Sequence, residues 1–221
     1  TEGVDLLTQD FENFGQGSAS PGATVPLSEG WGNVANGTID DLDWTPDLGG
    51  TPSTGTGPSV DNTLGTAAGT YLYVETSGSG SPNKVANLRS PVIDLSGTTN
   101  NRVEFYYHMY GSAMGSLSVQ GSTDGGATWS SDLFTASGNL GDQWNQAVVD
   151  LSAFDGESNF ILRVQGTSGA NDTSDMAVDD FRFFWGTPVD GIRIVSNTTG
   201  AVSIASSVTG MNVTGGYYDT T

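Results

Sequence analysis

The side chains of this sequence that could do chemistry are above all its carboxylates. The 221 residues include 25 Asp and Glu against six Lys and Arg, for a formal net charge of −19, with a single His and no Cys. This composition excludes thiol nucleophiles, Cys-rich zinc sites and His-pair metal sites. Two possibilities remain for the carboxyl groups: acid–base chemistry, or the binding of a hard cation such as Ca²⁺ through their oxygens.

A first group of acids lies within four residues, Asp40, Asp41 and Asp43, directly before Trp44. Because Ca²⁺ takes about six to eight oxygen ligands and tolerates irregular loops, this group could supply part of a calcium site. A solvated turn in an acidic protein explains the same pattern. The group alone favours the turn.

A second set of acids is split between the two ends of the main strand-rich region. Asp10 and Glu12 lie near its start, and residues 175–180 near its end contain three aspartates. Since first and last strands of a jelly roll commonly lie side by side, these acids could converge on one ion. Strand alternation predicts that Asp180 shares the core-facing row of Val178, where a carboxylate must be paired or ion-bound. The alternative is a strand-end acid that meets water or backbone N–H groups.

A catalytic role is not supported by the remaining candidates. A Ser-His-Asp triad needs an exposed nucleophile on a strained turn, and no such signature accompanies His108. Its aromatic neighbours favour a packed, hydrogen-bonded strand histidine instead. Pairs of carboxylates could be imagined as a glycosidase acid and nucleophile, but sequence spacing does not give their separation in space. We therefore predict that the chain is not an enzyme.

The elements that must position these groups are β-strands. Gly, Thr, Ser and Asn interrupt every candidate helix, whereas residues 103–110 alternate cleanly, with Val103, Phe105, Tyr107 and Met109 on one face. Further strand-like runs cover residues 71–75, 116–121, 144–150, 159–165 and 176–184. Short strands separated by Gly, Asp, Ser and Asn turns predict an all-β fold, an antiparallel β-sandwich or jelly roll.

Two stretches differ from this pattern. Residues 45–70 contain mostly Gly, Thr, Ser and Pro, which indicates a long ordered loop or a flexible insertion. Gly186-Thr187-Pro188 ends the strand pattern, and short alternating runs follow in a polar background. We predict one domain over residues 1–186, with residues 187–221 forming a linker or the start of a following module, or adding extra strands.

Residues 122–129, Ser-Thr-Asp-Gly-Gly-Ala-Thr-Trp, match an Asp box, which is a β-hairpin motif. In such a turn Asp124 caps backbone N–H groups, Gly takes a positive φ, and Trp129 packs back over the hairpin. The motif predicts a folding element and says almost nothing about function.

Aromatic side chains are a second class of candidate binding residues, because exposed rings of β-sandwich modules stack on sugars. Tyr106 and Tyr110 on the His108 face, Trp31 and Trp144 are the candidates. Many of the chain's aromatic residues must belong to the core of the sandwich, so the sequence does not decide which rings are exposed.

The net charge bounds the possible partners. A charge of −19 repels phosphate backbones and anionic membrane surfaces, which argues against nucleic-acid binding. No apolar run approaches the roughly 18 residues of a membrane-spanning helix, so we expect no membrane insertion. The excess of Asp and the single lysine suit a secreted or cell-surface protein in calcium-bearing surroundings.

Several segments, taken in their order along the chain, resemble the MAM domain family over nearly all of residues 8–185. They include Asp-Phe-Glu at 10–12, Gly-Pro-Ser-Val-Asp-Asn-Thr at 57–63, Phe-Tyr-Tyr-His-Met-Tyr-Gly at 105–111 and Asp-Met-Ala-Val-Asp-Asp at 175–180. The resemblance implies a jelly-roll β-sandwich of extracellular proteins that mediates adhesion or assembly and is not itself an enzyme. It also implies that residues 45–70 are an ordered part of the domain.

Family members can hold a structural cation, so the resemblance also implies a bound Ca²⁺. The first candidates for its ligands are Glu12, Asp41 and Asp180, and the further candidates are Asp10, Asp43, Asp61 and Asp175. Animal members carry disulfide-forming cysteines that this chain lacks, and the Asp box is outside the usual animal pattern. These departures suggest a bacterial version in which the cation carries more of the work of fixing the chain ends.

The leading hypothesis is therefore a calcium-stabilised adhesion or recognition module of a larger secreted or surface protein. The alternative is a carbohydrate-binding module of a secreted glycan-degrading enzyme, with Tyr106 and Tyr110 as its ligand-binding residues. A carboxylate-dependent glycan hydrolase or lyase is a distant third. Expected partners are a protein or glycan on a cell surface or matrix, and a second copy of the chain could add to an exposed strand edge.

Overall fold

The computed structural model describes residues 3–17, 25–37, 39–186, 194–196 and 202–204. The chain divides into two units, Val4–Gly186 on the one hand and Thr1–Gly3 with Thr187–Thr221 on the other. We describe each unit by itself. Within the described residues no helix is long and apolar enough to cross a membrane.

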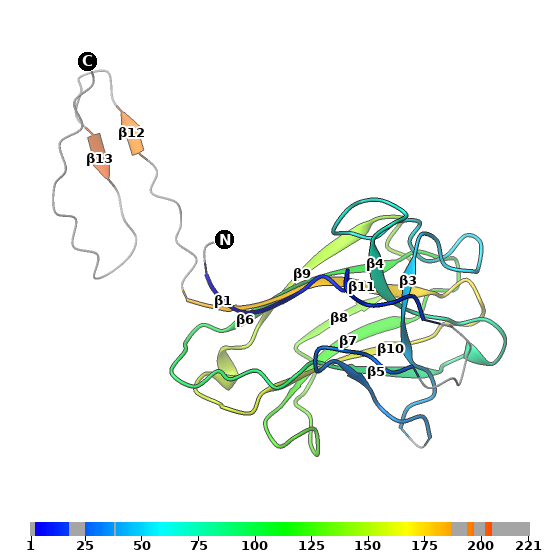
Figure 1. Cartoon of the computed structure of the whole chain (residues 1–221), viewed down its shortest axis with the longest axis horizontal. Helices are drawn as coiled ribbons and strands as arrows, with labels where there is room; N and C mark the ends of the chain where they lie inside the picture. Colours follow the sequence, from blue (N-terminus) through cyan, green and yellow to red (C-terminus); the bar gives the residue numbers. More distant parts are fainter. Residues whose placement is uncertain (1–2, 18–24, 38, 187–193, 197–201, 205–221) are drawn as a thin grey trace. The chain divides into compact units, whose positions relative to one another are not determined.

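The larger unit is a sandwich of two antiparallel sheets (Figure 1). The first sheet has the order β3-β4-β11-β6-β9, and β1 pairs with β11 beside this path. Its strands are β1 (Val4–Gln9), β3 (Trp44–Leu48), β4 (Thr70–Val74), β6 (Arg102–Met109), β9 (Trp144–Asp150) and β11 (Met176–Trp185). The strand nearest the start of the unit and the strand at its end therefore lie side by side, as the sequence predicted.

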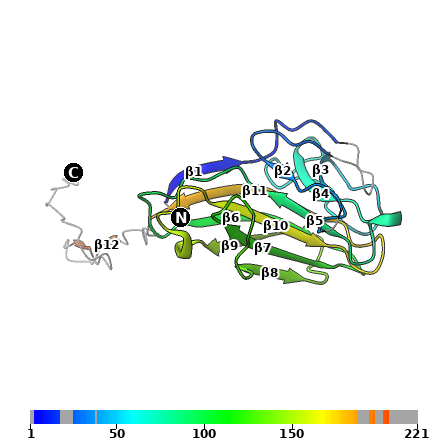
Figure 2. The same cartoon turned by 90° about the horizontal axis from the view of Figure 1, so that it is seen from below.

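The second sheet has the order β2-β5-β10-β7-β8, and Figure 2 shows it as the other layer of the sandwich. Its strands are β2 (Gly32–Asn33), β5 (Val85–Arg89), β7 (Ser116–Ser122), β8 (Phe134–Ser137) and β10 (Ile161–Thr167). Two 3₁₀ turns, Gly78–Gly80 and Ser152–Phe154, are the only helical segments in the described part of the chain. The predicted all-β antiparallel jelly-roll sandwich is confirmed.

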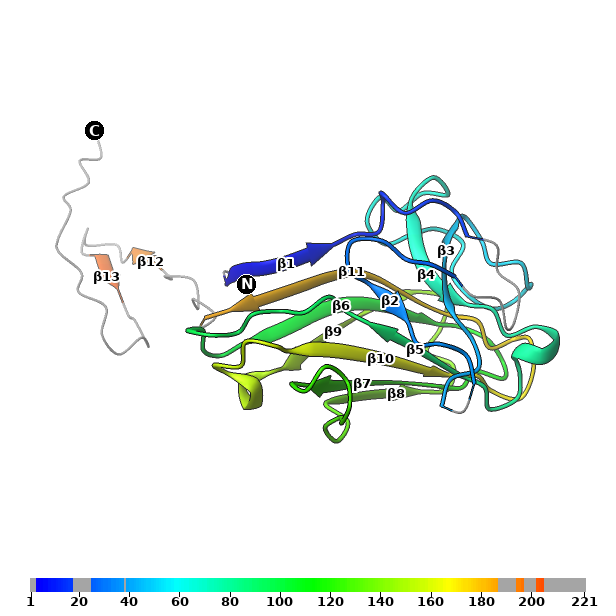
Figure 3. The same ribbon diagram turned by 60° about the horizontal axis from the view of Figure 1, so that its bottom comes forward.

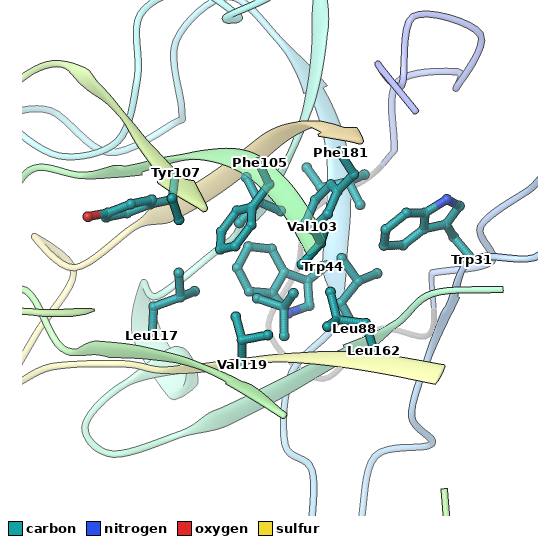
Figure 4. Packing of buried hydrophobic residues seen from close by; sticks show 14 of the residues in the cluster. Trp31, Trp44, Leu88, Val103, Phe105, Tyr107, Leu117, Val119, Leu162 and Phe181 are labelled. Carbon is teal, nitrogen blue, oxygen red and sulfur yellow. The ribbon is translucent and has the colours of Figure 1, made fainter. Parts of the chain in front are cut away.

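Alternating apolar residues from both sheets form the core (Figure 4). The predicted inward row of β6 is confirmed: Val103, Phe105 and Met109 are fully buried, and Tyr107 nearly so. Phe105 stacks on Phe181 of β11 with a centroid distance of 5.0 Å and an interplanar angle of 6°. Period-two patterning thus selects which face of each strand packs inward.

All six strand-like runs of the sequence correspond to strands, but the sequence did not indicate β1, β3, β5 or β8. Strand β3 contains Pro46, which has no N–H to donate to a ladder. It is tolerated because β3 lies at the edge of its sheet and pairs only with β4. Strand β8 is short, and its residues are half-buried or exposed.

The Asp box forms the predicted hairpin after β7. Asp124 accepts hydrogen bonds from the backbone N–H of Thr128 at 2.9 Å and from its hydroxyl at 2.6 Å. These bonds hold the pKa of the Asp124 carboxyl well below its usual range. Gly125 and Gly126 take φ values of +74° and +83°, which only glycine adopts readily.

In the smaller unit, β12 (Ile194–Ser196) and β13 (Val202–Ile204) pair as an antiparallel two-stranded sheet. The other residues of the segment 187–221 lie outside the described residues. The interpretation of residues 187–221 as a linker, as the start of a following module or as extra strands stays a prediction.

The stacked pair at the centre of the core yields a stability prediction. Phe105→Ala should lower the free energy of unfolding by about 3–5 kcal/mol, because it removes a fully buried ring and leaves a cavity. Chemical denaturation monitored by Trp fluorescence measures this change. The control Val148→Ala, at a side chain 56% exposed on β9, should cost less than about 1 kcal/mol. Similar losses in both variants would contradict the assigned core.

Candidate functional site at the β11 junction

Strand β11 changes its neighbour in the middle. Residues 176–178 pair with β4 and residues 181–185 pair with β1, and Figure 3 shows β1 running beside β11. Against β6 the register runs to Asp179 opposite Tyr106 and resumes at Arg182 opposite Glu104, so β11 has one extra residue there. This β-bulge holds Asp180 at φ +50°. We call the bulge and the acids around it the β11 junction.

The burial of the two aspartates at the bulge is the reverse of the expected pattern. Asp180 was expected in the core-facing row, but the extra residue breaks the alternation, and Asp180 is half-buried while Asp179 is fully buried. Asp179 accepts hydrogen bonds from the backbone N–H of Asn62 at 2.9 Å and of Asp180 at 2.8 Å. Alternation alone did not indicate Asp179, because this residue lies on the outer row of β11, opposite Tyr106, and it is the segment carrying Asn62 that covers it.

The segment between β3 and β4 reaches the junction. The side chains of Asn62 and Thr63 donate to the two carboxylate oxygens of Asp180 at 2.5 and 2.7 Å. The same segment lies over the outer face of the first sheet, where Trp144 donates its indole N–H to the carbonyl of Val60 at 3.0 Å. Residues 45–70 are therefore an ordered cover, as the family resemblance implied.

Glu12 and Asp61 meet beside the bulge. Glu12 accepts a hydrogen bond from the backbone N–H of Thr70, at the start of β4, at 2.9 Å. Asp61 is 1% exposed and accepts from the backbone N–H groups of Leu64 and Thr66 at 2.6 and 3.0 Å. Gly69 is required here, because a Cβ at that position would lie 2.1 Å from the Asp61 carboxylate. The two carboxyl groups face each other from different elements.

Burial and mutual repulsion act on these acids. Burial raises the pKa of Asp179 to about 8, and the charges of Asp180 and Asp61 add to the rise. Burial also raises the pKa of Glu12, against the hydrogen bond from Thr70, and the charges of Asp61 and Asp10 act in the same direction as burial. Several negative groups therefore gather at the junction and repel one another, and the buried Asp179 is affected most.

The junction opens into a hollow of roughly 570 Å³, which we call the junction hollow. Polar side chains form most of its wall, among them Asp10, Asn62, Tyr106 and Asp180. Arg182 bridges two acids at its edge, with Asp5 at 2.6 Å and Glu104 at 3.4 Å. Of the two predicted ligand-binding tyrosines, Tyr106 lies here.

Tyr110 lies elsewhere. It lines a separate hollow of roughly 350 Å³ together with residues of the segment 50–59 and Asp142. The nearby His108 is 2% exposed, with its Nε2 3.2 Å from the Asp142 carboxylate. A packed, hydrogen-bonded strand histidine is thus confirmed. The structure does not bring Tyr106 and Tyr110 into one hollow.

The acids named by the sequence analysis fall into three groups. Glu12, Asp10, Asp61 and Asp180 meet at the β11 junction. Asp41 instead forms an ion pair with Lys84 at 3.1 Å and accepts from the backbone N–H of Val85. These two bonds hold the pKa of Asp41 below its usual range.

Asp43 and Asp175 have partners of their own. Asp43 accepts from the backbone N–H of Val25 at 2.5 Å, and Asp175 accepts from the N–H and hydroxyl of Thr76 at 3.0 and 2.8 Å. Burial raises the pKa of Asp175 to about 6, and the charge of Glu75 adds to the rise. Neither Asp43 nor Asp175 is among the charges that raise the pKa values of Glu12 and Asp179 at the junction.

Carboxylates are suitable ligands for Ca²⁺, but the acids at the junction are too few to fill its coordination shell. Over the described ranges, no three His, Cys, Asp or Glu side chains lie close enough together to hold a metal ion. Ca²⁺ also accepts backbone and amide oxygens, and two facing carboxylates offer the negative charge that it needs. A calcium ion at the junction would therefore have to draw most of its shell from oxygens other than those of the carboxylates.

The other aromatic candidates are mostly covered. Trp31 is 3% exposed and belongs to the core. Tyr71 and Tyr73, on the outer face of the first sheet, are buried, and Trp144 packs against them. Among the described residues no Phe, Tyr or Trp is classed as exposed. A row of exposed rings suitable for stacking on a sugar chain is absent from this part of the chain.

Comparison with known proteins now decides the family. The family model described as MAM domain, meprin/A5/mu, matches residues 29–187. The chain belongs to the MAM domain family. MAM domain-containing glycosylphosphatidylinositol anchor protein 2 of mouse is 36% identical over 163 residues, which are 67% of this chain and 17% of that protein. Neuropilin-1 of Xenopus laevis is 34% identical over 157 residues, covering 68% and 16%.

The chain thus spans about one sixth of the length of these curated relatives. Among solved structures, a cleaved adhesin domain of Lys-gingipain from Porphyromonas gingivalis superposes with a TM-score of 0.54 at 17% identity. The match covers 82% of this chain and 98% of the adhesin domain. At this identity the likeness shows a shared fold only.

The loop acids of this MAM domain predict a pH dependence. Asp40 is 1% exposed, and burial, with the charges of Asp43 and Asp41, raises its pKa to about 7. Below its unfolded pKa near 4 the group is protonated in both states. Above that value the unfolded chain releases the proton first, so stability falls as the pH rises from about 4 to about 7.

Asp40→Asn should reduce the fall in stability between pH 5 and pH 7.5 in EDTA, measured by urea denaturation. Its Oδ1 accepts both bonds from Asn87, at 2.7 Å each, and an amide oxygen keeps them. Asp94→Asn is the control, because the hydrogen bonds with Ser96 hold the pKa of Asp94 below its usual range and its charge does not act on Asp40, so its removal should leave the pH slope unchanged. An unchanged slope in Asp40→Asn would contradict a raised pKa.

Proposed function

We propose that this MAM domain is a non-catalytic adhesion or recognition module of a larger secreted or cell-surface protein. Family membership carries the proposal, since the relatives include a protein named as a glycosylphosphatidylinositol anchor protein and neuropilin-1. The junction hollow, which is large and mostly polar, offers a place for a partner's polar groups. Association of two copies stays a further prediction.

The acids around the junction hollow are held in hydrogen bonds and ion pairs, which supports a non-catalytic role. A glycosidase needs a carboxylic acid and a carboxylate free to act on either side of a bond. Here Asp180 accepts from Asn62 and Thr63, and Glu104 pairs with Arg182. These carboxylates hold the structure together, and His108 is buried and bound to Asp142.

We further propose that Glu12 and Asp61 provide the acidic ligands of a structural Ca²⁺, and that the charge of Asp179 acts on the ion without ligating it. The support is their convergence from the end of β1, the cover segment and β11, and the repulsion that a cation would relieve. A bound cation would supply positive charge where burial and like charges raise the pKa values of Glu12 and Asp179. It would also fix the end of β1 to the start of β4.

A carbohydrate-binding role is the second candidate. The observation in its favour is the polar wall of the junction hollow with the half-buried Tyr106 beside it. The covered rings of the first sheet weigh against stacking along that face. A sugar would therefore be held mainly through its hydroxyl groups.

The calcium proposal predicts a large effect of chelation. Calcium at about 100 times its dissociation constant adds roughly 2.7 kcal/mol, so the melting midpoint should be about 5–10 °C higher in calcium than in EDTA. Glu12→Gln should lose most of this difference, because the amide keeps the bond from Thr70 but removes a charge. Asp41→Asn, outside the junction, should keep it. Equal midpoints, with no metal found by elemental analysis, would rule the proposal out.

The recognition proposal predicts that Tyr106 contributes to partner binding and Tyr110 does not. The assay measures binding of the multimerised domain to cells and to a glycan array. Tyr106→Ala should weaken this binding at least about tenfold, as expected for a central aromatic contact. Tyr110→Ala is the matched control in the other hollow, and both variants must keep the wild-type melting midpoint. Loss after protease treatment of the cells indicates a protein partner, and loss after glycan removal indicates a sugar. Wild-type binding by Tyr106→Ala would exclude the junction hollow.

A further inference from the structure

Two arginines lie side by side on the outer face of the second sheet. Arg163 of β10 is directly opposite Arg89 of β5 on one side and Gln120 of β7 on the other. The three side chains therefore form a row across three strands. Arg163 also donates from its Nη2 to the amide oxygen of Gln120.

The Asp-box hairpin holds this pair in place. The Trp129 ring lies 4.3 Å from the guanidinium carbon of Arg163 and 5.3 Å from that of Arg89. Gly126 allows the close approach, since a Cβ there would lie 2.9 Å from Nη1 of Arg89. Stacking on an indole orients a guanidinium without neutralising its charge. We call Arg89, Arg163, Gln120 and Trp129 the arginine row.

The two arginines form no ion pair over the described residues, although carboxylates are abundant in this chain. The chain has 25 acidic and six basic residues, and Lys84 and Arg182 each pair with a carboxylate. Over the described residues neither Arg89 nor Arg163 forms an ion pair, and the Nε of each is buried without a hydrogen-bond partner. Asp132 and Asp40 act on Arg163 only from a distance. Two adjacent positive charges thus have no directly bonded carboxylate in the described part of the chain.

This arrangement is costly in the unliganded domain. Burial and the neighbouring charge of Arg89 lower the pKa of Arg163. An anion placed between the two guanidinium groups would relieve their repulsion and accept the charge-assisted hydrogen bonds that they do not make within the protein. Carboxylate matches the planar donor fork of arginine. The arginine row therefore has the chemistry of a carboxylate site.

The surroundings of the row suit a sugar. The next row of the sheet consists of Asn87, Gln165 and Ser118, and Gln165 donates to Asn87 at 2.9 Å. Asn87 is buried and bonded to Asp40, but Gln165 and Ser118 are half-buried, so their amide and hydroxyl groups can bond sugar hydroxyls. A net charge of −19 repels long polyanions, but at physiological salt it is screened beyond about 8 Å, so one acidic group can bind locally.

We propose that the arginine row binds a single sugar acid, a uronate residue of a largely neutral glycan. Its carboxylate lies between Arg89 and Arg163, and its hydroxyls face Gln120 and Gln165. This inference rests on the proposed recognition role and gives it a ligand class and a second surface, on the opposite sheet from the junction hollow.

NMR of the intact chain tests the proposal directly, because its sequence contains only five arginines and hence five Arg Nε–H signals. The probes are glucuronate, galacturonate and mannuronate, with glucose as the sugar lacking charge and acetate as the charge lacking a sugar. At least one uronate should shift the signals of Arg89 and Arg163 in a saturable way. Its dissociation constant should be at least about tenfold lower than those of acetate and glucose.

Arg89→Gln and Arg163→Gln should each weaken uronate binding about tenfold or more, whereas Arg163→Lys should retain part of it through its charge. Arg102→Gln, on the other sheet, is the matched control and should bind as the wild type does. Melting midpoints separate a binding role from simple packing under Trp129. If the arginine variants melt lower yet bind the uronate normally, the row is structural and the proposal is wrong.

Two further outcomes overturn the proposal. Equal binding of acetate and uronates would show a general carboxylate site, and tighter binding of a tetraglutamate peptide would show a site for acidic polypeptides. Absence of any shift in the two Nε–H signals would show that the row binds none of these anions. Failure of the recognition role itself is seen separately, because cell binding that depends on Tyr106 is measured on the other sheet.

Discussion

The burial of one carboxylate organises the functional end of this domain. The first half of strand β11 pairs with β4 and its second half pairs with β1. The extra residue of the bulge lies where the neighbouring strand changes. Asp179, fully buried there, accepts one N–H from its own strand and one from the segment between β3 and β4. A buried carboxylate without these donors would be strongly destabilising. The placement of the segment between β3 and β4 therefore depends on this group.

The outer faces of the two sheets differ in what covers them. On the first sheet, the chain covers its own aromatic side chains, leaving the polar junction hollow beside Tyr106. On the second sheet, Asp40 is bonded to the buried Asn87 of the outer face, and the Asp-box hairpin orients two half-buried arginines beside it. Because the core needs only the inward row of each strand, the outward rows can differ in this way without affecting the fold.

Sequence reasoning reached the fold more completely than the site. The row from Val103 to Met109 and the strands around it follow from local alternation, which depends on neighbours along the chain. Strand β3 was missed because its Pro46 is acceptable only at a sheet edge, and edges are not visible in the sequence. Asp180 was misplaced because a single bulge residue shifts the later positions of an alternating pattern. Asp179 was missed because the segment that covers it comes from a distant part of the chain.

By itself, the sequence determined the all-β class, the family, the Asp-box hairpin and a chemistry limited to carboxylates, since these follow from composition, local period and motif. The tertiary structure alone decided which acids meet. It brought Glu12 and Asp61 together at the β11 junction and gave Asp41 to Lys84 instead. It also set Arg89 beside Arg163, which are 74 positions apart in the chain, through strand register. Long-range pairing of strands is a property of the whole packed core, and no short stretch of sequence specifies it.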